Sequence, residues 1–313
     1  MGHSGRDAAA DVLRGWALDE DLKARVMASP ALAAVATRIA ERYTAGETVH
    51  DAIAAAKRSV ARGHLVSLEY AGESVRDAEL AKAETAVFLD LIDQLRQAGI
   101  RSTVSFDLSH IGSIVSPSLA LENALLMADA LAPLGTALMI SAEGSERTDL
   151  VLDLYDTLSA SGASIGITLQ ARLHRSEKDL ERLLEKPGPI RLVKGAFLEA
   201  AEVAYPRGSS ELHQNYLRLA DQLLDAGHPV SFATHDAGLI DEILRRHPGL
   251  GDVPQVEFEM LLGLGTSTLD RLRADNLTTR EYSIFGGEWW LYVLNRIAED
   301  PERVFDAIVA AGN

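Results

Sequence analysis

Near the carboxyl end of the chain, four polar side chains are spaced so that they share one face of a helix. Tyr292, Asn295, Arg296 and Glu299 follow one another at intervals of three, one and three residues, which places them on one helical stripe. The arginine could hold a carboxylate or a phosphate through its planar fork of donors. An outer helical face with an Arg296–Glu299 contact explains the same spacing, and spacing alone favours this simpler interpretation.

A second group of candidate residues lies in the segment Arg191–Phe197, which reads RLVKGAF. In a strand, alternation places Arg191 and Val193 on one face and Leu192 and Lys194 on the other. Two cations in a buried strand are costly unless they meet an anion. Either a phosphate-bearing cofactor or a carboxylate of the core could supply that anion, and the pattern favours the cofactor.

The segment Phe232–Asp236, which reads FATHD, passes from a strand directly into a helix. Backbone N–H groups at a helix N-terminus bind anions, and His235 is a candidate donor there. A single histidine at the start of a helix is nevertheless more often a cap than a ligand.

Acidic residues form a fourth and weaker candidate site. Glu69, Asp107 and Glu259 lie at the ends of strand-like segments, and with His235 they could bind Mg²⁺, Mn²⁺ or Zn²⁺. Acids are common at strand ends, and their spacing matches no known metal-binding motif. The chain has no cysteine, which excludes disulfides, thiolate catalysis and cysteine-bound metals.

The elements that must position these residues alternate between strand and helix. Near-continuous apolar runs predict strands that are buried on both faces, at Leu65–Tyr70, Thr103–Leu108, Ala137–Ala142, Ser164–Gln170, Ile190–Lys194, Pro229–Ala233, Gln255–Glu259 and Glu281–Phe285. This order predicts an α/β fold, a closed (β/α)₈ barrel with its chemistry at the carboxyl ends of the strands. The residues expected to converge there are Glu69, Asp107, Glu143, Gln170, Lys194, His235, Glu259 and Tyr282.

Helices are predicted before and between the strands. Residues 1–62 are expected to form a helical arm that packs on the barrel, and residues 63–313 the barrel itself; the arm contains Asp7–Ala17, Asp19–Met27, Pro30–Tyr43 and Thr48–Arg62. Periodicity and Ser or Asp caps predict the barrel helices at Ser74–Ala98, Ser116–Leu134, Ser145–Ser161, Ser176–Glu185, Ser209–Ala226, Asp236–His247 and Glu288–Ala311.

The composition and the charge of the chain argue against some classes of binding partner. The net charge of −16 argues against nucleic acid and anionic membranes as electrostatic partners. No apolar run reaches the ~18 residues of a membrane span, and Met1–Asp7 lacks a secretion signal; we therefore expect a cytoplasmic protein. No Rossmann, P-loop or nucleophile-elbow motif is present.

Taken together, these segments resemble the proline dehydrogenase family, FAD-dependent flavoenzymes with a distorted (βα)₈ barrel. The resemblance runs from about Arg42 to Val304. It is carried by Thr48–Val75, Leu138–Glu143 (LMISAE), Gly166–Arg175 (GITLQARLHR), Arg191–Phe197, Phe232–Asp236, Phe258–Gly263 (FEMLLG) and Glu281–Glu299. The interval between Tyr282 and Tyr292 resembles that of the short, monofunctional members.

The resemblance assigns roles to these residues. It implies that FAD is bound by Gln170, Arg191, Val193, Lys194, Gly195, Thr234 and His235. It implies that Arg296 holds a substrate carboxylate and that Tyr292 and Glu299 belong to the same site. Tyr282 matches a tyrosine that packs on the substrate ring, and Glu73 matches a glutamate that gates the pocket.

Departures from the family pattern fall mainly on the substrate side. Asn295 stands in place of the first arginine of a carboxylate-binding pair, and asparagine cannot form a charged fork. Asp107 stands in place of a lysine, Ser141 in place of an aspartate, and Phe197 in place of a tyrosine. Asp107 and Ser141 follow neighbouring strands. The lysine and the aspartate of the family pattern, a cation and an anion, have therefore been replaced together.

The resemblance implies oxidation of L-proline, or of a related cyclic amino acid or amine, to an imine by hydride transfer to flavin N5. It also implies a small amine or imino acid substrate and a quinone as electron acceptor. Three alternatives stay open: a Schiff-base lyase that uses Lys194, a metal-dependent barrel, and a catalytically inactive flavin-binding or scaffold protein.

Overall fold

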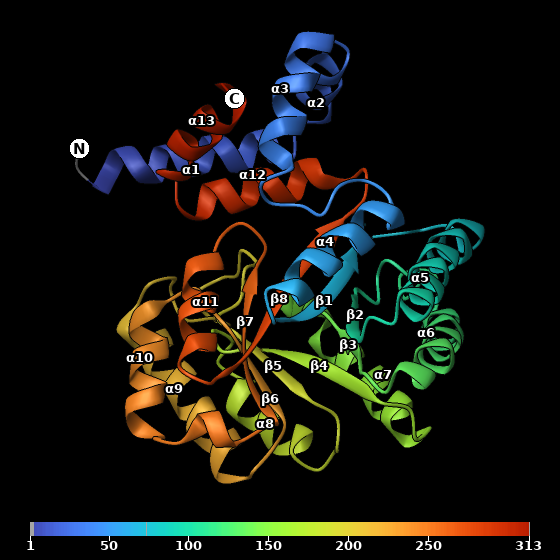
Figure 1. Ribbon diagram of the computed structural model, residues 1–313, viewed down its shortest axis with the longest axis vertical. Helices are drawn as coiled ribbons and strands as arrows, with labels where there is room; N and C mark the ends of the chain where they lie inside the picture. Colours follow the sequence, from blue (N-terminus) through green and yellow to red (C-terminus); the bar gives the residue numbers. More distant parts are fainter. Residues whose placement is uncertain (1–2, 73, 313) are drawn as a thin grey trace.

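Eight short segments rich in Val, Ile, Leu and Phe pair in chain order and close into a parallel barrel, in which the first strand pairs with the last (Figure 1). The computed structural model describes residues 3–72 and 74–312. The strands are β1 (Leu65–Tyr70), β2 (Ser102–Phe106), β3 (Leu138–Ile140), β4 (Ile165–Gln170), β5 (Ile190–Val193), β6 (Val230–Ala233), β7 (Val256–Leu261) and β8 (Thr278–Phe285). Their ends differ from the predicted ones by at most three residues, and the predicted (βα)₈ barrel is confirmed.

Helices surround this barrel, and all of them except α11 follow the order that the sequence predicts (Figure 1). They are α4 (Val49–Ala61), α5 (Ala78–Ala98), α6 (Pro117–Leu131), α7 (Thr148–Ala160), α8 (Ser176–Leu183), α9 (Ser210–Asp225), α10 (Ala237–Arg246) and α11 (Thr266–Ala274), with short 3₁₀ turns η1 (Ala132–Leu134), η2 (Ser145–Arg147) and η3 (Leu250–Asp252). Side-chain caps fix several starts, because Thr48, Ser116, Ser209 and Asp236 each accept a backbone N–H of the first turn.

The outward faces of the strands carry the main hydrophobic core. Leu68, Val104, Phe106, Leu192 and Phe232 are fully buried between the strands and the helices. Burial of one such side chain stabilises the fold by about 1.5–3 kcal/mol. The helices therefore attach to the barrel through the apolar half of each strand.

The inward faces of several strands are polar, unlike the layers of branched aliphatic side chains that usually fill such barrels. Arg191 on β5 reaches across the interior to Ser67 on β1 and Ser105 on β2. Nearer the amino ends of the strands, Arg280 pairs with Glu257 and donates to the Val66 carbonyl. The apolar runs in the sequence identify the strands correctly but do not reveal this interior.

The helices α1 (His3–Ala17), α2 (Glu20–Met27), α3 (Pro30–Ala40), α12 (Trp289–Glu299) and α13 (Arg303–Gly312) form a separate layer, which we call the cap (Figure 1). Its own hydrophobic cluster joins Leu13 and Tyr43 near the amino end to Trp289, Trp290 and Ile297 near the carboxyl end. In contrast, Ala52 and Ile53 of α4 belong to the barrel core. The division of the chain at residue 62 stays a prediction.

Four predicted helical features were wrong. The helix α11 was missed, because it is short and buries only Leu269 and Leu272. The predicted helix Glu288–Ala311 is two helices, because Pro301 lacks an N–H and forces Asp300 into an extended conformation.

Two predicted starts also differ, those of α5 and α7, whereas α8 begins at Ser176 as predicted but is not capped by its side chain. The helix α5 begins at Ala78, capped by Asp77, and not at Ser74. Ser145 and Ser176 do not cap helices; they donate to Glu199 and to the Gln170 carbonyl.

Candidate active site

A cavity of about 800 Å³ lies between the carboxyl end of the barrel and the cap. Volumes of about 300–1,000 Å³ are typical of small-molecule sites. Its floor comes from the barrel strands and their loops, and its roof from α1, α12, α13 and the turn between the last two. The site therefore joins residues from both ends of the chain.

The structure brings most of the predicted site residues to this cavity. All seven predicted cofactor residues line it, namely Gln170, Arg191, Val193, Lys194, Gly195, Thr234 and His235. Six of the predicted substrate-side residues line it as well, namely Asp107, Ser141, Tyr282, Tyr292, Arg296 and Glu299. Asn295 is half-buried on α12 and is not among the lining residues. Glu73 lies outside the described residues.

At the floor of the cavity, Arg191 forms a bidentate pair with a buried carboxylate. Its Nε and Nη2 atoms donate to the two carboxylate oxygens of Glu259, each at 2.9 Å. Burial alone would raise the pKa of Glu259, but the charges of Arg191 and Arg280 and a hydrogen bond from Ser231 lower it. The barrel carboxylate, and not a phosphate, thus supplies the counter-charge that the sequence requires.

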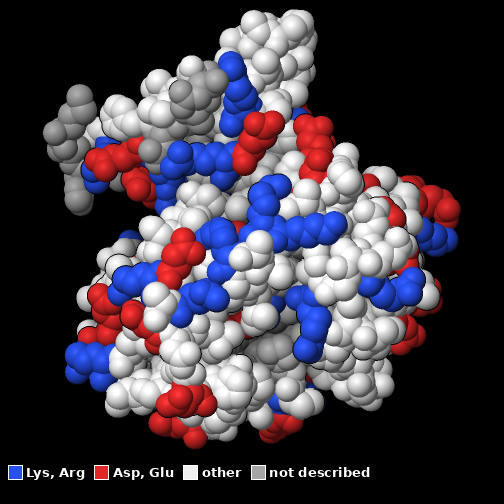
Figure 2. All heavy atoms as spheres, viewed as in Figure 1, with Lys and Arg blue, Asp and Glu red and all other residues white. Residues whose placement is uncertain are grey.

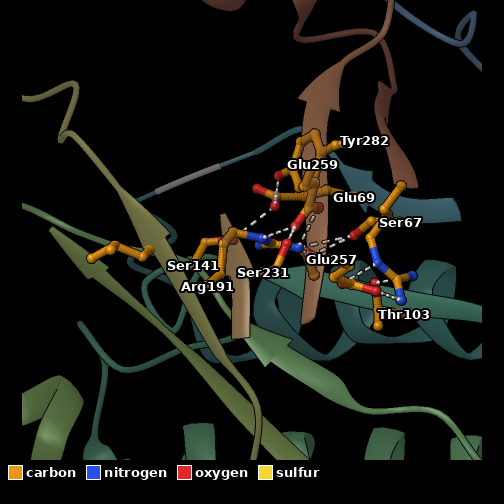
Figure 3. A network of polar contacts seen from close by, with 12 residues as sticks. Ser67, Glu69, Thr103, Ser141, Arg191, Ser231, Glu257, Glu259 and Tyr282 are labelled. Carbon is orange, nitrogen blue, oxygen red and sulfur yellow. Dashed lines mark hydrogen bonds and ion pairs between the residues drawn. The ribbon is translucent and has the colours of Figure 1, made fainter. Parts of the chain in front are cut away.

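Above this pair, Tyr282 and Glu69 form a second polar group (Figure 3). The Arg191 guanidinium lies 4.9 Å from the centroid of the Tyr282 ring. The Tyr282 hydroxyl donates to Glu69 Oε2, which also accepts from Ser141 Oγ at 2.7 Å. Burial and the nearby Glu69 raise the pKa of Tyr282 well above its usual value, so the phenol stays a donor.

Lys194 and the start of α10 are likewise occupied by protein groups. The Lys194 ammonium is ion-paired with Asp236, and Asp236 Oδ1 accepts the Leu239 N–H at 3.2 Å. Asp236 is the N-cap of α10. The expectation that this helix N-terminus offers its first donors to a bound anion is corrected, because the chain's own carboxylate takes that position.

His235 acts as an acceptor and not as the expected donor at Nε2. The Leu261 N–H donates to His235 Nε2 at 3.0 Å, which places the ring proton on Nδ1. Protein atoms lie close around the ring, although the side chain as a whole is exposed at the cavity wall. This desolvation of the ring, together with the charges of Arg303 and Arg296, lowers the pKa of His235 to about 4. The ring is therefore neutral at physiological pH.

On the roof, the contacts of Arg296 agree with both interpretations of the helical spacing: a contact with Glu299 and a site for an anion. Arg296 Nη1 lies 2.9 Å from Glu299 Oε1, as the simpler interpretation predicts. Arg296 also lies over the Tyr292 ring and faces the cavity, where its buried Nε has no hydrogen-bond partner among the described residues. A charged donor without a partner is costly when buried, and an anionic ligand would satisfy it.

One strand-end residue does not converge on the cavity. Glu143 accepts the Ser109 N–H at 2.8 Å and pairs with Arg147, away from the floor. The strand β3 ends at Ile140, so the alternation that brings Ser141 inward does not continue to Glu143.

Sequence reasoning missed several residues of the site. Thr168 lines the floor two residues before Gln170, a spacing that strand alternation could have revealed. Arg14, Arg207 and Arg303 line the cavity from the cap and from the β5–α9 loop. No local signal marks these arginines, because their position depends on how the cap packs on the barrel.

The model of the proline dehydrogenase family matches residues 52–288. The chain is also 34% identical to the proline dehydrogenase of Deinococcus radiodurans, over 85% of this chain and 87% of the relative. It is 28% identical to proline dehydrogenase 2 of Bacillus subtilis, over 85% and 88%. The chain belongs to the proline dehydrogenase family.

Solved structures show the same fold at lower sequence identity. Proline utilization A from Bdellovibrio bacteriovorus, inactivated by N-propargylglycine, superposes with a TM-score of 0.72 at 21% identity over 84% of this chain. A mutant of the Bradyrhizobium japonicum protein gives 0.73 at 21% identity over 87%. This proline dehydrogenase family member spans only 32% of either of those chains.

The residues around the cavity fit a flavin cofactor, on which this family depends. Gln170 Oε1 and Thr168 Oγ1 are buried acceptors without a partner among the described residues. Gly195 has φ +110°, and a Cβ there would meet Arg172 Cγ at 2.8 Å and Gln170 Oε1 at 3.1 Å. The open acceptors suit a planar ring with N–H donors, and the glycine allows Arg172 and Gln170 to pack closely against the backbone of this wall.

Basic residues complete the fit. Although the net charge is −16, Lys and Arg gather in a band between the cap and the barrel (Figure 2). Burial and the neighbouring charges of Arg172 and Arg14 lower the pKa of Arg207. Such crowding of like charges is relieved by an anion, and the phosphates of a dinucleotide would provide it.

The geometry disfavours two of the alternative enzyme classes. A nucleophilic lysine requires a desolvated amine, whereas Lys194 is ion-paired and its side chain is 38% exposed. No group of three His, Cys, Asp or Glu residues that could hold a metal exists in the described part of the chain. Glu259, one of the predicted metal ligands, is bonded to Arg191 instead. Within residues 3–72 and 74–312, no helix is long and apolar enough to cross a membrane.

Proposed function

We propose that the chain oxidises L-proline, or a closely related cyclic amine, to the imine with FAD as the hydride acceptor at N5. The observation that carries the proposal is Arg296, which lines the cavity of a proline dehydrogenase family member and whose buried Nε has no partner among the described residues. A substrate carboxylate would accept from this guanidinium. The substrate ring would then lie between the cap and the floor.

In this proposal Arg296 holds the carboxylate alone. Asn295 is neutral and half-buried, so it adds no second cationic fork. Loss of one of two charge-assisted contacts costs about 2–5 kcal/mol of binding. We therefore expect a weaker preference for carboxylate-bearing substrates than a paired-arginine site would give.

The cofactor would be held by residues of β4, β5 and β6. Gln170 and Thr168 have acceptors for ring N–H groups, and Gly195 lines the same wall. Lys194, Thr234 and His235 line the same wall, with Arg207 nearby for the phosphates. Bound FAD supplies the two-electron acceptor, while the protein orients the amine and excludes water. We further propose a quinone as the final electron acceptor.

An anaerobic absorption spectrum of the purified protein, recorded before and after addition of L-proline, tests the proposal. We expect a flavin spectrum that loses its visible absorbance with L-proline. Pyrrolidine, which lacks the carboxylate, separates the two substrate classes: bleaching by pyrrolidine alone would assign an amine without a carboxylate. A protein that neither retains nor takes up FAD would contradict the proposal.

Variants of the cofactor wall sharpen this test. Gly195→Val should abolish FAD binding, because its side chain would collide with Arg172 and Gln170. Gly227→Ala is the matched control, since Gly227 also has positive φ but a Cβ added there would meet no atom within 4 Å. Equal FAD content in both variants would place the cofactor elsewhere.

A further inference from the structure

Glu69 differs from three other acids of the cavity in that it forms no ion pair with a described residue. Glu259 is paired with Arg191, Asp236 with Lys194, and Glu299 with Arg296. Glu69 accepts from two neutral hydroxyls, those of Ser141 and Tyr282. Its charge also helps to raise the pKa of Arg191, but that arginine is bonded to Glu259, so the Glu69 carboxylate can still pair with a cationic ligand.

The structure holds this carboxylate in a fixed position at the cavity. Glu69 lies at the end of β1, is 9% exposed, and lines the cavity. Ser141 Oγ donates to Oε2 at 2.7 Å, and the Tyr282 hydroxyl donates to the same oxygen. Oε1 accepts no hydrogen bond from any described residue. Two donors on one oxygen fix the group, while the second oxygen keeps its capacity to accept.

A second carboxylate strengthens the negative potential at this wall. β1 and β2 pair with Glu69 opposite Ser105, so Asp107 follows two residues further along the neighbouring strand. Asp107 lines the cavity, and its charge contributes with that of Glu69 to the raised pKa of Tyr282. The nearest floor arginine, Arg191, is already bonded to Glu259. This end of the cavity therefore favours a cation.

That cation is an ammonium and not a metal ion. The described residues contain no group of three acids or histidines that could form a metal cage, whereas one or two carboxylates suffice to bind an ammonium. An aliphatic secondary amine resembles the lysine amine, with a pKa of about 10. It consequently arrives protonated at neutral pH and must lose a proton before oxidation.

We infer that Glu69 is a catalytic residue that binds the protonated amine and removes its proton. This inference rests on the proposed function. In the first step the N–H bond breaks and an O–H bond forms on Glu69, which frees the nitrogen lone pair. With the flavin bound, the adjacent C–H bond would then break, its electron pair would leave as hydride to the flavin, and the lone pair would form the C=N bond. The product would be the protonated imine, and the flavin would hold the two electrons.

The pH dependence of flavin reduction tests the inference. For Glu69→Gln, which keeps the shape and hydrogen-bonding capacity of the side chain, we expect reduction by L-proline at pH 7 to slow by roughly 10²–10⁴-fold. The rate should recover as the pH rises towards the pKa of the amine, because the free amine then needs no base. The pH profile is a readout that a purely structural role would not change.

Three further variants keep the test decisive. Glu69→Asp retains the carboxylate and should keep the wild-type pH profile at a lower rate, even if Glu69→Gln folds poorly. Ser141→Ala removes only a positioning hydrogen bond, so we expect a loss of about tenfold without a change in profile. Glu146→Gln, an exposed acid that does not line the cavity, is the control.

The outcomes separate this inference from the proposed function. A Glu69→Gln protein with the wild-type pH profile, or a Glu69→Asp protein that behaves like Glu69→Gln, would overturn the role of Glu69 while proline oxidation stands. Wild-type flavin that is not reduced by L-proline or pyrrolidine at any pH would remove the proposed function, and the inference with it.

Discussion

Two arginines face the same cavity, and they are in opposite states. Arg191 on the floor donates to both oxygens of Glu259 and to Ser67 and Ser105, and it is almost completely buried. Arg296 on the roof has one carboxylate partner, Glu299, whose side chain is 34% exposed, and its Nε has no partner among the described residues.

This difference separates charges that hold the barrel together from charges that await a ligand. A buried cation that forms a bidentate pair with a buried carboxylate has its charge neutralised by the protein and stabilises its surroundings. A cation with an unused, desolvated donor is costly in the free protein and gains most when an anion binds. How the protein neutralises each arginine, and not the presence of an arginine, therefore marks the binding side of the cavity.

The largest effect should come from breaking the floor pair on one side only. Arg191→Met leaves Glu259 buried without its partner and should lower the free energy of unfolding by about 3–5 kcal/mol. The double variant Arg191→Met with Glu259→Leu removes both charges and should recover most of that loss. Urea unfolding followed by circular dichroism measures both, and equal losses in the two variants would contradict the comparison.

On the roof, Arg296→Met should affect activity far more than stability. We expect kcat/KM for L-proline to fall by roughly 30- to 4,000-fold, equivalent to about 2–5 kcal/mol, with a stability change below about 1 kcal/mol. Arg25→Met, at an exposed position of the cap, is the matched control. Steady-state kinetics with pyrrolidine should show little loss, and equal losses for both substrates would rule out carboxylate binding by Arg296.

His235, between floor and roof, should make the free energy of unfolding depend on pH between about pH 4 and pH 6.5. Its folded pKa of about 4 lies below the usual 6.5, so the unfolded state binds more protons between these values. Stability should therefore fall as the pH drops from about 6.5 to about 4.

The size of this His235 effect should be small, on the order of 1 kcal/mol, because the side chain is exposed at the cavity wall and solvent screens its charge. In His235→Asn this part of the pH dependence should disappear. Thermal unfolding midpoints of both proteins at pH 7 and pH 5 measure the difference, and parallel curves would contradict it.

The smallest effect should come from releasing Arg296 from Glu299. Glu299→Gln removes a partly exposed ion pair, worth about 0.2–1 kcal/mol, so the free energy of unfolding should change little. The freed guanidinium should lower KM for L-proline by up to about fivefold at unchanged kcat. A raised KM would instead show that Glu299 positions Arg296 for the substrate.

Much of the fold and many of the cavity residues could be predicted from local patterns. The convergence of parallel strands correctly brought Gln170, Glu259 and Tyr282 to one cavity. The same rule failed for Glu143, because β3 ends before that residue. The polar interior of the barrel was not predicted. In the sequence, a serine or a charged residue within a short apolar strand gives the same pattern whether its side chain faces inward or outward.

What the sequence by itself determined is the order of strands and helices, the family, and the residue types at the strand ends, because these depend on short-range periodicity and motifs. Only the tertiary structure decided which charges meet. Arg191 and Glu259 are 68 residues apart in the chain, and the cap joins residues from both termini over the same cavity. Such pairings depend on barrel closure and on helix packing, which no local spacing encodes. For the same reason, only the structure distinguishes Arg191, which is paired with a buried carboxylate, from Arg296, and Glu69 from the acids that form ion pairs.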